Sequence, residues 1–128
     1  MIVGHIAIYT NDLERLKRFY VTYFDAVSNL KYRNETTGLE TYFLSFEGSK
    51  TQIELMYRPN VTDRPSETAH LGYAHLAFTL GSRAKVDYLT QLLQSDGYVI
   101  MNQPRVTGDG FYESVVLDPD GNLIELVA

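Results

Sequence analysis

The apolar and polar positions along the chain follow an order of strands and helix that occurs twice. Apolar residues three and four positions apart, with charged residues between them, predict an amphipathic helix after the first strand. Asn11, followed by Glu14 three residues later, predicts the capping box that begins this helix. The elements expected in the first copy are a strand over 2–9, a helix over 13–24, and strands over 26–32, 40–46 and 52–57.

The second copy repeats this β-α-β-β-β order. Ser82 is the expected N-cap of its helix, and Gly97 is expected just after the helix end. The polar segment 102–110 is expected to be a loop and, with its glycines, a candidate mobile lid. Asp-Pro-Asp-Gly at 118–121 predicts a tight turn. The strands expected in this copy cover 72–80, 98–101, 111–117 and 122–127.

A segment without periodicity separates the two copies. It covers 59–70, contains two prolines, and predicts a linker between a first module over 1–58 and a second over 71–128. A module of about 60 residues buries little apolar surface by itself, so the two modules are expected to pack together. The sequence therefore predicts one α+β domain over 1–128, built from two tandem βαβββ modules.

Composition narrows the classes of function. Apolar residues make up 45% of the 128 residues, which is enough for a packed core, and the net charge of −5 argues against nucleic-acid binding. The absence of cysteine excludes disulfides and a thiol nucleophile, so any metal would have nitrogen and oxygen ligands. The N-terminus has no signal-peptide pattern and no apolar run could span a membrane, so the cytoplasm is the expected location.

The duplicated strands each carry one ionisable residue in an apolar setting. His5 recurs as His75 at an offset of 70 residues, and Glu54 recurs as Glu125 at an offset of 71. A carboxylate among apolar strand residues is costly unless it is paired or binds a cation. A single such His or Glu is usually an ordinary strand residue, but two equivalent pairs favour a shared four-ligand cation site.

These motifs resemble the vicinal-oxygen-chelate superfamily, whose members include glyoxalase I, fosfomycin-resistance proteins, extradiol dioxygenases, methylmalonyl-CoA epimerase and bleomycin-resistance proteins. The resemblance covers essentially the whole chain and implies paired modules that form a curved, mixed eight-stranded sheet around a divalent metal. It rests on HIAI at 5–8, Phe19-Tyr20, QIEL at 52–55, HLAF at 75–78 and DPDGNLIEL at 118–126.

Within this superfamily, the set His5, Glu54, His75 and Glu125 resembles the metal ligands of glyoxalase I, the lactoylglutathione lyase. The resemblance implies Ni²⁺ or Zn²⁺, with Co²⁺ or Mn²⁺ as alternatives, and a homodimer that acts on a small molecule with oxygens on adjacent carbons. Glu125 is the expected base for the proton alpha to the carbonyl, with Glu54 making the reciprocal transfer.

The chain departs from glyoxalase I where that enzyme holds glutathione: Tyr9, Arg58 and, in the nearest alignment, Thr107 occupy those places. Tyr9, Arg58 and Arg105 are therefore the expected substrate-binding residues, for an anionic or aromatic ligand, although either arginine is also explained as surface charge. The alternatives are an epimerase or antibiotic-resistance protein with a substrate other than glutathione, and a non-catalytic ligand-binding module. Aromatic residues expected to line either a pocket or the core are Tyr23, Tyr42, Phe43, Tyr57, Phe111 and Tyr112.

Overall fold

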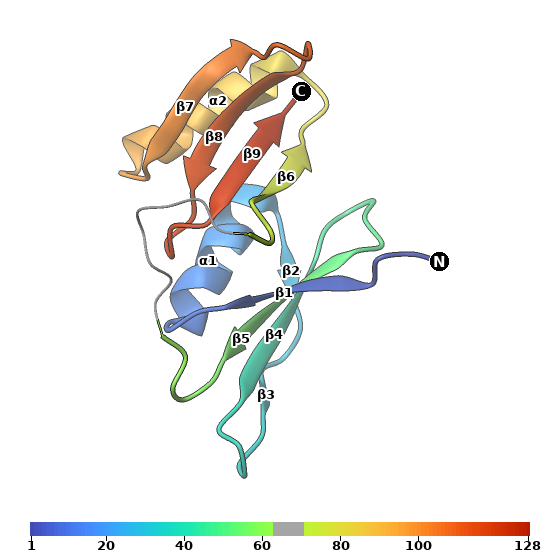
Figure 1. Ribbon diagram of the computed structural model, residues 1–128, viewed down its shortest axis with the longest axis vertical. Helices are drawn as coiled ribbons and strands as arrows, with labels where there is room; N and C mark the ends of the chain where they lie inside the picture. The colour runs from blue at the N-terminus through green and yellow to red at the C-terminus, as the bar shows by residue number, and fades with distance from the viewer. Residues whose placement is uncertain (63–70) are drawn as a thin grey trace. The chain divides into compact units, whose positions relative to one another are not determined.

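The computed structural model describes residues 1–62 and 71–128, which fold into two units, Met1–Pro65 (unit 1) and Ser66–Ala128 (unit 2). Unit 1 has one five-stranded sheet, in which β1, β5, β4 and β2 follow one another and β3 also pairs with β4 (Figure 1). β1 and β5 run parallel, and the other pairs are antiparallel. The elements are β1 (His5–Tyr9), α1 (Leu13–Phe24), β2 (Val27–Ser28), β3 (Tyr32–Arg33), β4 (Glu40–Ser45) and β5 (Gln52–Tyr57).

The helix α1 covers one face of this sheet. Alternate residues of β4 and β5 are buried on that face, among them Leu44 and Leu55, as are Leu16 and Tyr20 of α1. Because successive strand residues point to opposite faces, the residues between them form a second face, the open face of unit 1. Its members are His5, Ala7 and Tyr9 of β1, Gln52, Glu54 and Met56 of β5, and Thr41, Phe43 and Ser45 of β4.

The start of α1 corrects the sequence prediction by one residue. Asp12, and not Asn11, is the N-cap: its Oδ1 accepts a hydrogen bond from the backbone N–H of Arg15 at 2.9 Å. The predicted cap was wrong because both residues have suitable side chains, and the choice between them depends on where the backbone turns into the helix. Glu14, the expected capping-box partner, instead binds across the unit.

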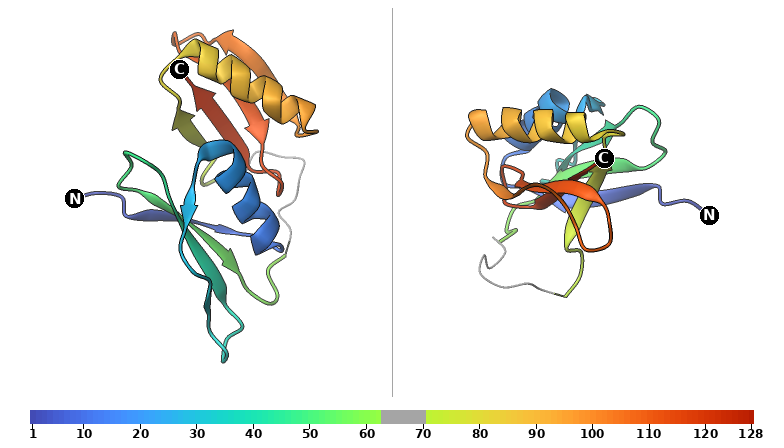
Figure 2. Two further views of the ribbon diagram at one scale, coloured as in Figure 1. Left: turned by 180° about the vertical axis from the view of Figure 1, so that it is seen from behind. Right: turned by 90° about the horizontal axis from the view of Figure 1, so that it is seen from above.

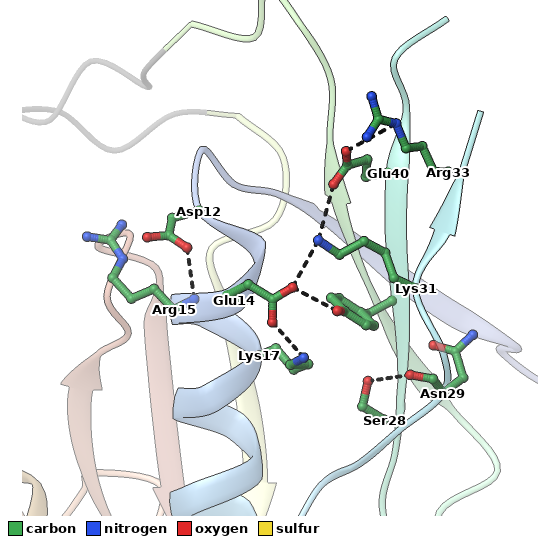
Figure 3. Close-up of polar contacts among 10 residues, drawn as sticks. Asp12, Glu14, Arg15, Lys17, Ser28, Asn29, Lys31, Arg33 and Glu40 are labelled. Atoms are coloured by element: carbon green, nitrogen blue, oxygen red, sulfur yellow. Dashed lines mark hydrogen bonds and ion pairs between the residues drawn. The ribbon is translucent and has the colours of Figure 1, made fainter. Parts of the chain in front are cut away.

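A polar network fastens α1 to the sheet (Figure 3). Glu14 pairs with Lys17 at 2.6 Å and with Lys31 at 2.9 Å, and it accepts a hydrogen bond from the hydroxyl of Tyr42 at 2.7 Å. Lys31 also pairs with Glu40 of β4 at 3.3 Å. The ammonium of Lys17 lies 4.1 Å from the centre of the Tyr42 ring. The network therefore ties the first turns of α1 to β4 and to the segment between β2 and β3.

The single strand predicted over 26–32 is two short strands in the structure. β2 pairs with one end of β4 and β3 with the other. Between them, Asn29 accepts a hydrogen bond from the backbone N–H of Phe43 through its side-chain oxygen, at 2.8 Å. The side chain of Asn29 thus takes a donor that a continuous strand would have paired with a backbone carbonyl, and the strand is interrupted there.

Unit 2 repeats the arrangement, with α2 lying across one face of a four-stranded sheet in the order β6-β9-β8-β7 (Figure 2). Ser82 is its N-cap, as predicted, and accepts from the backbone N–H of Lys85 at 3.3 Å. Gly97 follows the helix with φ +89°, a conformation that suits glycine, and this prediction is also confirmed. The elements are β6 (His75–Thr79), α2 (Arg83–Ser95), β7 (Ile100–Val106), β8 (Tyr112–Leu117) and β9 (Leu123–Val127).

The polar loop predicted over 102–110 is wrong for its first half, because β7 continues to Val106. Arg105 pairs with Glu113 of β8, and the register shifts on either side of Asn102. An irregular edge strand of this kind accommodates Pro104, which has no N–H to donate. Only the turn that follows, closed by a hydrogen bond from Thr107 N–H to the Phe111 carbonyl, is loop.

The α+β class and the tandem-module organisation are confirmed, with sheets of five and four strands. Among the described residues, no helix is long and apolar enough to cross a membrane. The predicted linker covers 59–70, and its residues 63–70 lie outside the described residues. The third histidine of the chain, His70, is among them.

Candidate functional site

In unit 1, one histidine and one glutamate meet on the open face. β1 and β5 pair in parallel, with His5 opposite Gln52 and Ala7 opposite Glu54. Nε2 of His5 lies 3.5 Å from Oε2 of Glu54. His5 and Glu54 are therefore diagonal neighbours across the two strands. The side chain of Ala7, directly opposite Glu54, is small and does not block the contact between them. The His5 side chain is 50% exposed and that of Glu54 is 16% exposed.

Unit 2 contains the same pair in the same register. β6 and β9 are parallel, with His75 opposite Leu123 and Ala77 opposite Glu125. Nε2 of His75 lies 3.2 Å from Oε2 of Glu125. The carboxylate is again the less exposed partner, at 20% against 43% for the imidazole. Each unit therefore presents an imidazole nitrogen beside a largely buried carboxylate, on the sheet face that its helix does not cover.

The donor chemistry of these pairs suits a divalent metal. Imidazole nitrogen and carboxylate oxygen are the usual protein ligands of Zn²⁺, Ni²⁺ and related ions. Within the described residues, no group of three or more His, Asp or Glu side chains gathers to hold a metal. Each unit thus supplies two donors, and the four-ligand set predicted from the sequence requires both units.

The surroundings of the two pairs differ. In unit 1, Phe43 lies opposite Glu54, and its ring meets the His5 ring nearly perpendicularly, with centroids 5.5 Å apart. In unit 2, Val115 occupies the position opposite Glu125 and is buried. An aromatic wall therefore stands beside the first pair and an aliphatic one beside the second.

The expected substrate-binding residues lie in different places. Tyr9 is on the open face of unit 1, where it pairs with Met56 and is 46% exposed. Arg58 is exposed just beyond the end of β5. Arg105 lies opposite Glu113, and its guanidinium is 3.7 Å from the Glu113 carboxylate. Tyr9 thus shares a face with the unit 1 pair. Arg105 is already engaged by a carboxylate.

The aromatic residues divide between the two faces. Tyr42 and Tyr112 are on the helix faces, because their hydroxyls donate to Glu14 of α1 and to Asp87 of α2. Phe43 alone of the predicted strand aromatics is placed on an open face by the pairing within the described residues. Sequence reasoning did not single out Met56 or Tyr32 as site residues. Their neighbours on adjacent strands follow from cross-strand register, which no local pattern reveals.

One family model and several known proteins are similar to this chain over nearly its whole length. The family model of the Glyoxalase/Bleomycin resistance protein/Dioxygenase superfamily matches residues 2–126. The uncharacterized protein YwkD of Bacillus subtilis is 36% identical over 128 residues, covering 97% of this chain and 94% of that protein.

Two solved glyoxalase I structures are also similar. That of Zea mays has a TM-score of 0.79 and 25% identity, covering 98% of this chain but only 43% of that one. That of Leishmania major, described as trypanothione-dependent, has a TM-score of 0.77 and 25% identity, covering 99% of this chain and 86% of the other.

Proposed function

The chain belongs to the Glyoxalase/Bleomycin resistance protein/Dioxygenase superfamily, and from this premise we propose that it is a metal-dependent lyase or isomerase of the glyoxalase I type. His5, Glu54, His75 and Glu125 would together hold one divalent cation, Ni²⁺ or Zn²⁺, with Co²⁺ or Mn²⁺ as alternatives. The observation that carries the proposal is the repeated pair: two imidazoles and two carboxylates in equivalent registers, 3.5 and 3.2 Å apart within each pair.

The chain's own residues have distinct roles in this proposal. When bound, a divalent cation supplies Lewis acidity for a substrate oxygen that gains negative charge. Glu125 accepts the proton alpha to the substrate carbonyl on its carboxylate and passes it to a substrate oxygen, and Glu54 takes a proton from the other substrate oxygen and delivers it to the neighbouring carbon. His5 and His75 serve as ligands only. The low exposure of both carboxylates supports this assignment, because exclusion of water keeps a carboxylate available to the substrate.

Glu125→Gln tests the role of the base. The amide is nearly isosteric, so the variant should keep the fold and lose about 10²- to 10⁴-fold in kcat. Turnover and far-ultraviolet circular dichroism would be measured together. Glu113→Gln, which changes another largely buried carboxylate of the same sheet, is the matched control and should keep most of the activity. A fully active Glu125→Gln enzyme would rule out that role.

The substrate carrier is tested separately. The hemithioacetals that methylglyoxal forms with glutathione and with trypanothione would be assayed in parallel, because a similar structure is that of a trypanothione-dependent enzyme. Turnover of either supports glyoxalase chemistry. Metal bound without turnover of either favours an epimerase or resistance protein with another substrate, and a protein that binds no metal favours the ligand-binding module. The homodimer and the cytoplasmic location stay predictions, and sedimentation velocity measures the first.

A further inference from the structure

Four side chains form a continuous row across the open face of unit 1. Tyr9 of β1 pairs with Met56 of β5, Met56 pairs with Thr41 of β4, and Thr41 pairs with Tyr32 of β3. Residues directly opposite one another in a sheet share a face, so this aromatic row crosses four neighbouring strands. With strands about 4.8 Å apart, the row is about 14 Å long.

The aromatic row lies next to the His5–Glu54 pair. Met56 follows Glu54 by two residues on β5, which places the row about 7 Å farther along the same face. Its two ends are aromatic and accessible, with Tyr9 46% and Tyr32 52% exposed, while Thr41 between them is buried. A molecule that is held at the His5–Glu54 pair and extends along the face would therefore meet the thioether of Met56, with the Tyr9 ring beside it.

Unit 2 has different chemistry in the equivalent row. Thr79 pairs with Val127, Val127 with Glu113, and Glu113 with Arg105, and the last two form an ion pair. The His–Glu pairs are the same in the two units, whereas this row is apolar and aromatic in one and charged in the other. The aromatic row is therefore particular to unit 1 and is not a consequence of the duplicated fold.

We propose that the aromatic row is a substrate subsite that binds a flat, aromatic group of a molecule whose two adjacent oxygens bind the proposed cation. This inference rests on the proposed function and names its class of substrate. Tyrosine rings and a methionine sulfur make favourable contacts with aromatic faces. The row contains no cationic side chain, so it does not suit the carboxylates of a peptide-like carrier.

A pair of hydroxamates measures the subsite without turnover. Benzohydroxamate and acetohydroxamate chelate a divalent metal through the same two oxygens and differ in a phenyl and a methyl group. With Ni²⁺-loaded protein in isothermal titration calorimetry, we expect benzohydroxamate to bind at least about tenfold more tightly, because its ring becomes buried. Tyr9→Ala, at the end of the row nearest the His5–Glu54 pair, should reduce this preference severalfold and leave acetohydroxamate affinity unchanged.

Tyr88→Ala is the control, since Tyr88 is an exposed tyrosine on α2, outside the aromatic row, and its loss should not alter the preference. An unchanged preference in Tyr9→Ala would overturn the subsite.

A metal-free arm separates this proposal from the proposed function. Benzamide keeps the ring but is a poor chelator, and the ¹³C-labelled methyl group of Met56 reports its binding by NMR. We expect benzamide to shift the Met56 resonance and not that of Met101, which is exposed on β7. If metal does not bind but Met56 shifts, the metal chemistry fails and the subsite stands. If Met56 does not respond, the subsite is refuted whatever the metal does.

Discussion

At the scale of single residues, Glu14 is the described carboxyl group whose pKa is shifted most strongly. Its hydrogen-bonded ion pair with Lys17 is the largest cause, followed by Lys31 and the hydroxyl of Tyr42, and together they lower its pKa from 4.5 to about 2. The same contacts raise the pKa of Lys17 and of Lys31. In unit 2, a hydrogen bond to Asp87 raises the pKa of Tyr112. In both units, the hydroxyl of a strand tyrosine thus donates a hydrogen bond to a carboxylate of the helix.

Glu14→Gln should make the stability of the protein less dependent on pH. Because the folded-state pKa is depressed, the stabilisation is present above about pH 4.5 and is lost as the pH falls toward 2. The side chain is 47% exposed and solvent screens it, so we expect a loss of at most about 1 kcal/mol at pH 7. Urea unfolding of both proteins from pH 7 to pH 2.5 measures the difference.

The difference between Glu14→Gln and wild type should shrink across that range, whereas Glu35→Gln, at a more exposed ion pair, should show almost none. A gap that stays constant down to the lowest pH would contradict the assignment to Glu14.

At the scale of elements, the two helices begin with different caps in equivalent places. Asp12 and Ser82 each accept from the backbone N–H three residues later, at 2.9 and 3.3 Å. This bond satisfies one of the N–H groups that the first turn of a helix leaves without an intrahelical acceptor. Each cap therefore fixes the residue at which its helix starts.

Asp12→Ala should destabilise the protein by about 1 kcal/mol, since alanine cannot accept the Arg15 N–H. Asn11→Ala changes the neighbouring residue, which the sequence pattern favoured as the cap, and should cost clearly less. Thermal unfolding of the two variants under one buffer condition decides between the residues. A larger loss for Asn11→Ala would return the cap to that position.

At the scale of the whole molecule, duplication gives two equivalent His–Glu pairs. Each unit positions one imidazole and one carboxylate by the same means, a parallel strand pair with alanine opposite the glutamate. Two donors bind a divalent cation weakly, whereas four complete a site with positions left for the substrate. The proposed function therefore depends on both units contributing to one centre.

His5→Ala and His75→Ala test this dependence. If the four ligands share one cation, wild type should bind one metal ion per set of four, and either substitution alone should lower the affinity for Ni²⁺ by at least about tenfold. Elemental analysis after dialysis and competition with a chromophoric chelator give stoichiometry and affinity. Half of the wild-type metal retained at unchanged affinity would instead mean two independent half-sites.

The sequence by itself determined the repeated β-α-β-β-β order, the residues of both helices and the Ser82 cap, because apolar periodicity and capping chemistry are local. It also paired His5 with His75 and Glu54 with Glu125 as equivalents, since a duplication is visible in the residues alone. Period two in a strand tells which residues share a face, so Phe43 separates from Tyr42 without coordinates.

Only the tertiary structure decided which of those faces the helix covers, and so that Tyr42 lies under α1 while Phe43 stands beside His5. It likewise extended β7 through Pro104, interrupted the strand at Asn29 and aligned Tyr9, Met56 and Tyr32 in one row. These features depend on register between strands distant in the chain. Register is set by the whole set of backbone pairings and by core packing, which no local stretch of sequence contains.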